Sequence, residues 1–200
     1  LPQELPAPAQ IGFTLKDVSE GRCTMETFVA QMEDEDLFCI VRGEGMSSPR
    51  VTPGTAGAIG GVSERLTDVF GLPTACCSDG PSGIRMDCGN KAFSLPNGTS
   101  QACTWNESLI AELYRMEGLE MRKYQVDALL GPGMNIHRHP LNGRNFEYFS
   151  EDPLVTGRMA VAQLSGLHSV GVTGTIKHYA CNNQEYSRRR VDAVVSQRAL

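Results

Sequence analysis

The chain has 200 residues, of which 40% are hydrophobic and 20% charged, so it can form a hydrophobic core in one domain, or in a domain with a tail. Its net charge of −5 argues against nucleic acid or an anionic membrane surface as the main partner. No apolar run approaches the ~20 residues of a membrane-spanning helix.

The cysteines indicate a reducing environment. There are seven of them, two are adjacent (Cys76 and Cys77), and no Cys-x-x-Cys occurs. This pattern predicts reduced, mostly buried thiols in a cytoplasmic protein rather than a disulfide framework. It gives no zinc spacing, and His137 and His139 lack a clear third ligand, so we expect no metal and no cofactor.

The chain begins with a proline-rich segment. Residues 1–10 contain three prolines and predict an extended linker, part of a lead-in that reaches residue 23. A first helix is expected from Thr24, since the next apolar residues follow helical spacing and form one face: Met25, Phe28, Val29 and Met32.

A long irregular loop and a short helix come next. Residues 43–61 contain six glycines and two prolines, which predicts the loop. Ser63 is expected to cap a helix that Gly71 ends. Its inward residues would be Leu66, Val69 and Phe70.

Alternating strands and helices fill the rest of the chain. Short apolar strands are predicted at 72–77, 126–130 and 172–176. Thr104 opens a capping-box pattern before a helix whose buried stripe would be Leu109, Leu113 and Met116. Asp152 and Pro153 have the N-cap and N1 pattern of a helix running to about Ser169.

This β, polar loop, α order occurs about three times and predicts an α/β fold with a parallel sheet and helices outside it. A (β/α)8 barrel and an open doubly wound sheet both fit. A full barrel takes ~250 residues, so residues 24–200 could supply about its first half.

Polar clusters follow the three predicted strands: Asp79, then Arg144 with Glu147, then Lys177 with His178. Alone, each has a structural explanation as a turn former, an ion pair or a solvated strand end. In a barrel, however, the carboxyl ends of the strands share one face, so these side chains would converge on one cavity. Alternating carboxylates and cations there would suit a polyhydroxylated ligand.

Three aromatic residues accompany these clusters: Tyr148, Phe149 and Tyr179. We assign them to the core. Stacking on a pyranose face is the alternative.

Three segments together resemble the barrel domain of glycoside hydrolase family 3, in its β-glucosidase branch. They are residues 78–83 (Ser-Asp-Gly-Pro-Ser-Gly), 131–153, and 177–185 (Lys-His-Tyr-Ala-Cys-Asn-Asn-Gln-Glu). Their order and spacing agree with the family, and the similarity runs from about residue 24 to residue 200. A branch resembling bacterial N-acetylglucosaminidases carries a second histidine in the last segment, which this chain lacks.

The resemblance implies a (β/α)8 barrel and a retaining exo-β-glycosidase, most similar to a β-glucosidase acting on terminal non-reducing β-D-glucosyl residues. It implies that Asp79, Arg144, Lys177 and His178 bind hydroxyls of the sugar in subsite −1. Glu147 would support Arg144 or Lys177. The nucleophilic aspartate and the acid/base glutamate have no match here and are expected elsewhere in the same polypeptide, so this piece alone should be inactive.

The proline-rich lead-in resembles members with reversed domain order, in which the acid/base domain comes first. A catalytically silent sugar-binding or scaffold barrel, and a β-xylosidase-type specificity, stay open as alternatives. The expected partners are a β-glucoside or oligosaccharide substrate and the rest of the polypeptide, without nucleic acid or membrane. A homo-oligomer is also left open.

Overall fold

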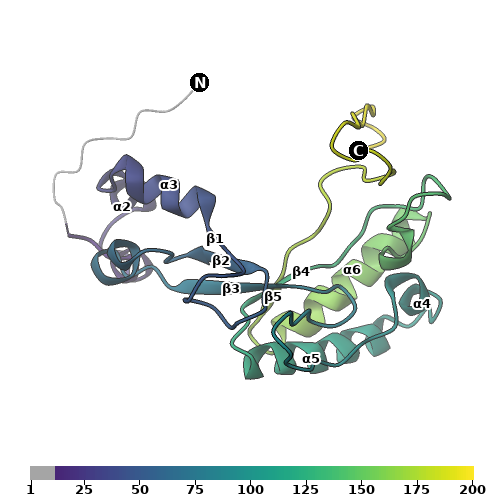
Figure 1. Ribbon diagram of the computed structural model, residues 1–200, viewed down its shortest axis with the longest axis horizontal. Coiled ribbons are helices and arrows are strands. Elements are labelled where there is room, and N and C mark those ends of the chain that lie inside the picture. Colours follow the sequence, from purple (N-terminus) through teal and green to yellow (C-terminus); the bar gives the residue numbers. More distant parts are fainter. Residues whose placement is uncertain (1–11) are drawn as a thin grey trace. The chain divides into compact units, whose positions relative to one another are not determined.

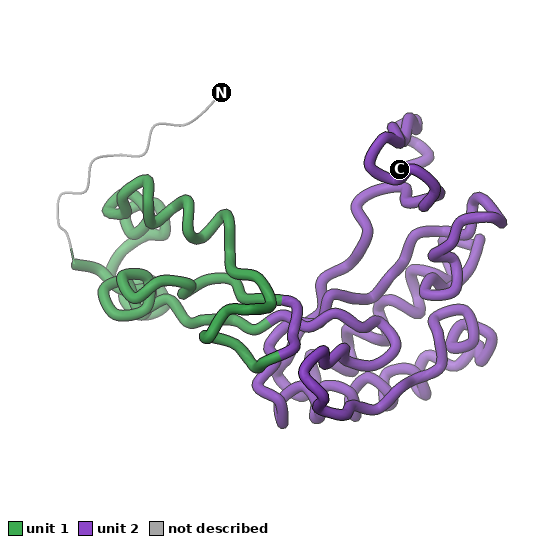
Figure 2. Tube along the Cα trace, viewed as in Figure 1, with its two compact units in different colours: residues 1–53, 57–76 green, residues 54–56, 77–200 purple. Residues whose placement is uncertain are grey.

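The computed structural model describes residues 12–200, so the predicted linker at 1–10 lies outside the described residues. The chain divides into two compact units, residues 1–53 with 57–76, and residues 54–56 with 77–200 (Figure 2). No helix among residues 12–200 combines the length and the apolar character needed to span a membrane.

The first unit contains short elements around a small aromatic core. Its helices are α1 (Leu15–Ser19), α2 (Met25–Ala30) and α3 (Asp34–Arg42), followed by strands β1 (Glu44–Gly45) and β2 (Gly57–Gly60) and the π-helical turn η1 (Arg65–Val69). Phe28 and Phe70 are buried and meet edge to face, with 6.2 Å between ring centroids. Helix α1 lies in the predicted lead-in.

The predicted start of α2 is confirmed, because the Thr24 side chain accepts a hydrogen bond from the Thr27 N–H. Its apolar face is shorter than predicted: Met25 is exposed, and Met32 follows the end of the helix.

Around η1 the predictions hold in part. Ser63 Oγ accepts from the Leu66 N–H as expected. Leu66 and Phe70 are buried, but Val69 is exposed because it lies off the face that these two residues share.

The irregular loop predicted at 43–61 is wrong in one respect, because it contains an antiparallel pair. Glu44 pairs with Ala58 in β1 and β2, and Gly45 with Gly57. Strands this short carry no periodic pattern. A Cβ atom at Gly57 would lie 2.1 Å from the Glu44 carbonyl oxygen, so only glycine permits this pairing.

The second unit is built from parallel strands joined by helices (Figure 1). Strand β3 (Thr74–Asp79) begins in the first unit and ends in the second, where it pairs with β4 (Ala128–Leu130), which pairs with β5 (Thr173–Gly174). Helices α4 (Gly98–Ala102) and α5 (Glu107–Lys123) separate β3 from β4. The 3-10 turn η2 (Asn145–Glu147) and α6 (Pro153–His168) separate β4 from β5.

Helices α5 and α6 pack side by side (Figure 1). The buried residues of α5 include Ile110, Tyr114 and Met121, whereas two of its predicted stripe residues, Leu109 and Met116, are about half exposed. The stripe prediction is therefore wrong by about one position. The prediction for α6 is confirmed: Pro153 is its first residue, and Asp152 Oδ1 accepts from the Leu154 and Val155 N–H groups.

The N-cap of α5 is Asn106, not Thr104. The Asn106 side chain accepts from the Leu109 N–H at 3.0 Å. Trp105 has a positive φ of 52°, which turns the chain between Thr104 and the helix and breaks the predicted capping box.

Candidate functional site

Asp79 and Lys177 meet at the carboxyl ends of the parallel strands, although they are 98 positions apart in the chain. Asp79 is the last residue of β3, and its Oδ1 lies 2.7 Å from Lys177 Nζ. The Gly80 N–H donates to the same oxygen at 3.0 Å. A bridge between Lys177 and Gly133 places Lys177 beside the chain that follows β4.

Glu147 lies between two cations. Arg144 Nε donates to its Oε1, and Lys177 Nζ is 3.9 Å from its Oε2. The Glu147 side chain is only 8% exposed, and both ion pairs offset the cost of burying its charge. Asp79, Lys177, Glu147 and Arg144 thus form one row of alternating charge.

This row controls the ionisation of Asp79. Partial burial raises the pKa of the Asp79 carboxyl, but the hydrogen bond and positive charge of Lys177, the Gly80 N–H and Arg144 outweigh burial and hold that pKa below its ordinary value. The carboxylate is therefore ionised at neutral pH and can accept hydrogen bonds.

His178 follows Lys177 of the row in the chain and is hydrogen-bonded to a buried tyrosine. The Tyr148 hydroxyl lies 2.8 Å from His178 Nδ1, and the two rings meet edge to face. Burial lowers the pKa of the His178 imidazole, and the charges of Arg144 and Lys177 lower it further. Glu147 and Glu185 oppose this effect without cancelling it, so His178 is neutral at pH 7.

Several residues missed by sequence reasoning complete the site. Asn182 Nδ2 donates to the Tyr148 hydroxyl at 2.7 Å and to Glu185 Oε1 at 3.1 Å. Asn135 bonds the peptide groups of His178, accepting from its N–H at 2.8 Å and donating to its carbonyl at 3.0 Å. The dense polar run at 181–185 was the one available signal for Asn182 and Glu185.

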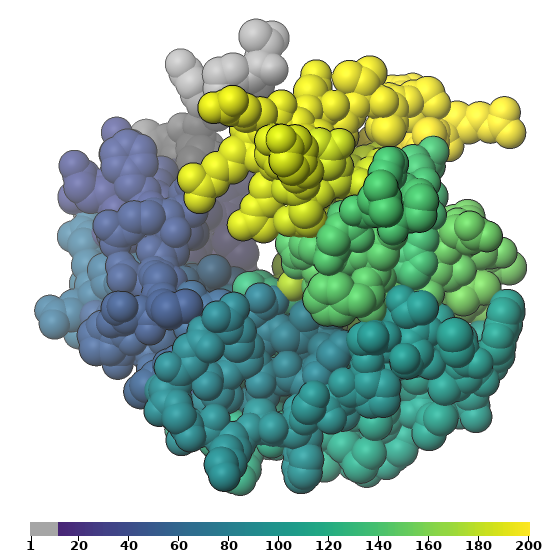
Figure 3. Space-filling view, turned by 45° about the vertical axis from the view of Figure 1, so that its right-hand side comes forward, coloured from purple at the N-terminus to yellow at the C-terminus, as the bar shows by residue number. Residues whose placement is uncertain are grey.

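A cavity of about 420 Å³ opens at this site. Arg144, His178, Asn182 and Glu185 are among the residues that line it. Asp79, Lys177 and Glu147 are not among its lining residues, and their link to it is the chain of ion pairs that ends at Arg144. Figure 3 shows the C-terminal residues beside the loop around residues 140–150. There the Asn142 amide donates to the Asn182 carbonyl at 3.0 Å.

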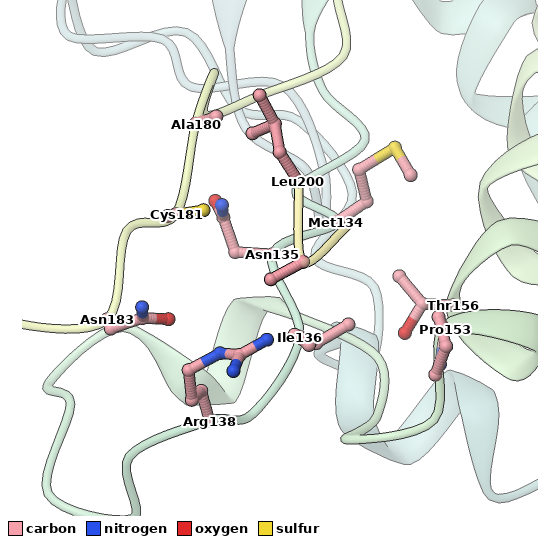
Figure 4. A pocket seen from close by; sticks show the side chains of 11 residues that line it. Met134, Asn135, Ile136, Arg138, Pro153, Thr156, Ala180, Cys181, Asn183 and Leu200 are labelled. Carbon is pink, nitrogen blue, oxygen red and sulfur yellow. The ribbon is translucent and has the colours of Figure 1, made fainter. Parts of the chain in front are cut away.

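A smaller neighbouring cavity, of about 230 Å³, is lined by residues from several segments, among them Asn135, Arg138, Thr156 and Cys181 (Figure 4). Asn135 therefore reaches this cavity while its amide holds the His178 main chain.

The aromatic residues divide into two kinds. The core prediction is confirmed for Tyr148 and Phe149, which are buried, and is wrong for Tyr179, which is 94% exposed. Tyr179 lies in the turn that leaves β5, and no helix or strand among residues 12–200 covers it.

The expectation of mostly buried thiols is wrong. Cys76 and Cys77 are buried in β3, whereas Cys88 and Cys103 are exposed in loops and the other three are half-buried. In the part of the chain that the structure describes, no three His, Cys, Asp or Glu side chains are grouped so as to hold a metal ion.

A buried polar relay supports the loop that follows Asp79. The Tyr114 hydroxyl on α5 donates to the Pro81 carbonyl. Gln101 Nε2 on α4 donates to Tyr114 at 3.0 Å, and Gln163 Nε2 on α6 donates to Gln101 Oε1 at 2.7 Å. All three helices of the second unit therefore hold the main chain two residues beyond the site carboxylate.

Parallel strands joined by helices, with polar side chains gathered at the strand ends, define an α/β protein with its site at the carboxyl edge of the sheet, as in TIM barrels. Residues 41–198 match the family described as "Glycosyl hydrolase family 3 N terminal domain". The chain belongs to this glycosyl hydrolase family, and both the resemblance and the predicted fold class are confirmed.

Comparison with individual proteins agrees with the family match. The chain is 63% identical over 200 residues to a β-glucosidase of Ruminococcus albus, of which it covers 21%. It matches the crystal structure of a β-glucosidase from Paenibacillus barengoltzii with a TM-score of 0.93 and 58% identity, covering 100% of this chain and 22% of that one.

A second solved structure is β-glucosidase 3B from Thermotoga neapolitana in complex with glucose, with a TM-score of 0.70 and 38% identity, covering 79% of this chain and 23% of that one. The chain thus spans about a fifth of the length of the relatives it matches.

Proposed function

We propose that the full-length protein is a retaining exo-β-glycosidase, specifically a β-glucosidase, and that this segment supplies the sugar-binding part of subsite −1. The observation that carries the proposal is the row of alternating charge, Asp79 to Arg144, with neutral His178 beside it. The names of the relatives agree with it, and one of those relatives was solved with glucose.

The row can both donate hydrogen bonds to hydroxyl groups and accept hydrogen bonds from them. Ionised Asp79 accepts hydrogen bonds, whereas Lys177 and Arg144 donate them. A sugar hydroxyl donates and accepts, so neighbouring hydroxyls on one ring can each find a partner. Because the cations already pair with carboxylates, the groups are held in place before the sugar arrives.

The bond-making steps need two further carboxylates. In a retaining mechanism an aspartate attacks the anomeric carbon while a carboxylic acid protonates the leaving oxygen, and water then hydrolyses the glycosyl-enzyme. These two groups lie roughly 5–5.5 Å apart in such enzymes. We place both in other parts of the full-length polypeptide, as the greater length of the relatives suggests.

The test is a panel of 4-nitrophenyl glycosides with the full-length protein. We expect the β-D-glucoside to be hydrolysed fastest, β-glucose to be the first-formed anomer by NMR, and a glucose-mimicking lactone to inhibit. Faster hydrolysis of the β-xyloside would shift the specificity within the class. Release of α-glucose first, or no hydrolysis of any glycoside, would contradict the proposal.

A further inference from the structure

The buried hydroxyl of Tyr148 lies between an amide and an imidazole. The residue is 0% exposed, so it does not reach a ligand in the cavity. Its oxygen lies 2.7 Å from Asn182 Nδ2 and 2.8 Å from His178 Nδ1. A tyrosine hydroxyl has one proton to donate and lone pairs with which to accept.

Glu185 fixes the orientation of the Asn182 amide. An ionised carboxylate only accepts hydrogen bonds, so the amide end that lies 3.1 Å from Glu185 Oε1 must be the NH2 group. The same nitrogen has a second hydrogen, and that hydrogen is directed to Tyr148. Tyr148 therefore accepts from Asn182, and its own proton remains available for His178.

The proton arrangement follows from this order. If Tyr148 donates to His178 Nδ1, that nitrogen carries no proton, and a neutral imidazole must carry its proton on Nε2. With the proton on Nδ1 instead, the tyrosine oxygen would accept twice, and within residues 12–200 no third group receives its proton.

The surroundings of His178 keep the imidazole neutral and fix its position. The charged or titratable groups that face it are Arg144, Lys177, Glu147, Glu185 and Tyr148. Burial and the two cations lower its pKa. Asn135 is hydrogen-bonded to both the N–H and the carbonyl group of His178, which fixes the position of the backbone that carries the imidazole ring.

We propose that Tyr148 is a positioning residue that, together with Asn182 and Glu185, holds His178 as the Nε2–H tautomer, so that the ring presents a single donor to a hydroxyl oxygen of the bound sugar. Nε2 is on the ring edge away from Tyr148, and His178 lines the large cavity. The identity of the ligand rests on the proposed function, whereas the tautomer does not.

Neutron diffraction from deuterium-exchanged crystals of the full-length protein, without substrate, tests the tautomer directly. We expect deuterium on His178 Nε2, none on Nδ1, and the Tyr148 deuterium directed at Nδ1. Deuterium on Nδ1 overturns the proposal. Because no catalysis is involved, this result stands whether or not the protein hydrolyses glucosides.

Kinetics of the full-length protein test the role. Tyr148→Phe should lower kcat/KM for 4-nitrophenyl β-D-glucoside about 10- to 100-fold, because a loosened His178 loses its alignment. Tyr148→Phe should also shift the acid limb of the kcat/KM profile to higher pH. The reason is that the lost hydrogen bond favoured the neutral form of His178, so its loss raises the pKa of the imidazole. Tyr124→Phe removes a hydroxyl that donates to the Lys91 carbonyl and should change neither.

The His178→Gln background separates positioning from packing. Glutamine places a donor near the position of Nε2 but has no counterpart of Nδ1, so adding Tyr148→Phe should then cost less than about threefold. An equal loss in both backgrounds would mean that Tyr148 acts through packing, and the proposal would fall. Failure of the wild-type protein to cleave any glycoside would instead contradict the proposed function.

Discussion

At this site, the charge balance of each ionisable residue depends on its ion-pair partners. Asp79 is 39% exposed, and its partial burial raises the pKa of its carboxyl, but Lys177 at 2.7 Å helps to hold that pKa below its ordinary value. Lys177 is in turn shared with Glu147. One substitution in the row therefore leaves a neighbour with an unbalanced charge.

Asp79→Ala in the full-length protein should lower kcat/KM for an aryl β-glucoside roughly 30- to 900-fold, which corresponds to about 2–4 kcal/mol of transition-state stabilisation. Asp87→Ala is a matched control, because Asp87 is 36% exposed and pairs with Arg85 at 2.9 Å. A loss within about threefold for Asp79→Ala would remove Asp79 from the sugar site.

Glu117 should make stability depend on pH. Burial raises its pKa from 4.5 to about 8, Glu120 adds to this, and the Gly83 main chain opposes it. Because the folded state holds the proton more tightly, the stability that the group contributes is full below pH 4.5 and is lost as the pH rises towards about 8.

Glu117→Gln should therefore raise the thermal unfolding midpoint of the full-length protein at pH 8 and flatten its decline between pH 5 and 8. The free energy involved is on the order of 2–5 kcal/mol. Glu112→Gln, an exposed change on the same helix, should leave the slope between pH 5 and 8 unchanged, because Arg115 lowers the pKa of the Glu112 carboxyl below 4.5. Parallel profiles for wild type and Glu117→Gln would show that Glu117 is ionised in the folded protein.

Part of the site could be predicted from the positions of charged residues after the predicted strands. Asp79, Arg144 and Lys177 could be placed together because they follow parallel strands. Tyr148 could be assigned to the core, but its hydrogen bonds to His178 and Asn182 could not be predicted, since they depend on loop geometry and side-chain rotamers that carry no sequence period.

At the scale of elements, one glycine lets α5 and α6 approach closely, and a second lets α5 pack against the chain that follows α6. A Cβ atom at Gly166 would lie 2.2 Å from the Ala111 carbonyl oxygen, and one at Gly118 would lie 2.5 Å from Val170 Cγ2. The face of α5 that is buried is therefore chosen by where the helix backbones meet. The spacing of apolar residues alone predicted a buried face shifted by about one position along α5.

Gly166→Ala should destabilise the protein by about 1–3 kcal/mol, because overpacking outweighs the better helix propensity of alanine. Gly157→Ala on the same helix meets nothing within 4 Å and should be neutral or stabilising by up to about 1 kcal/mol. Thermal unfolding of both full-length variants checks this. Equal effects would mean that the helices separate without cost.

At the scale of the whole molecule, the net charge of the row differs from the net charge of the chain. The chain carries −5, whereas the row contains two carboxylates and two cations and sums to zero around a neutral imidazole. A neutral sugar that binds to the row would therefore leave the charge of the row unchanged.

Inhibition by glucose should accordingly depend little on salt. We expect its inhibition constant to change less than about twofold between 50 and 500 mM NaCl, because screening acts on net charge and on exposed pairs. Glucuronic acid, measured under the same conditions, should inhibit more weakly. A steep dependence of glucose inhibition on salt would indicate an unbalanced charge at the site.

The hydrogen bonds between the loops that follow β4 and β5 have a consequence for engineering. Asn135 holds His178, Asn142 holds Asn182, and Tyr148 joins both partners. Neither loop can be exchanged alone without losing donors and acceptors that only its own counterpart supplies. Chimeras designed to acquire another enzyme's sugar preference should therefore transplant the two loops as one cassette.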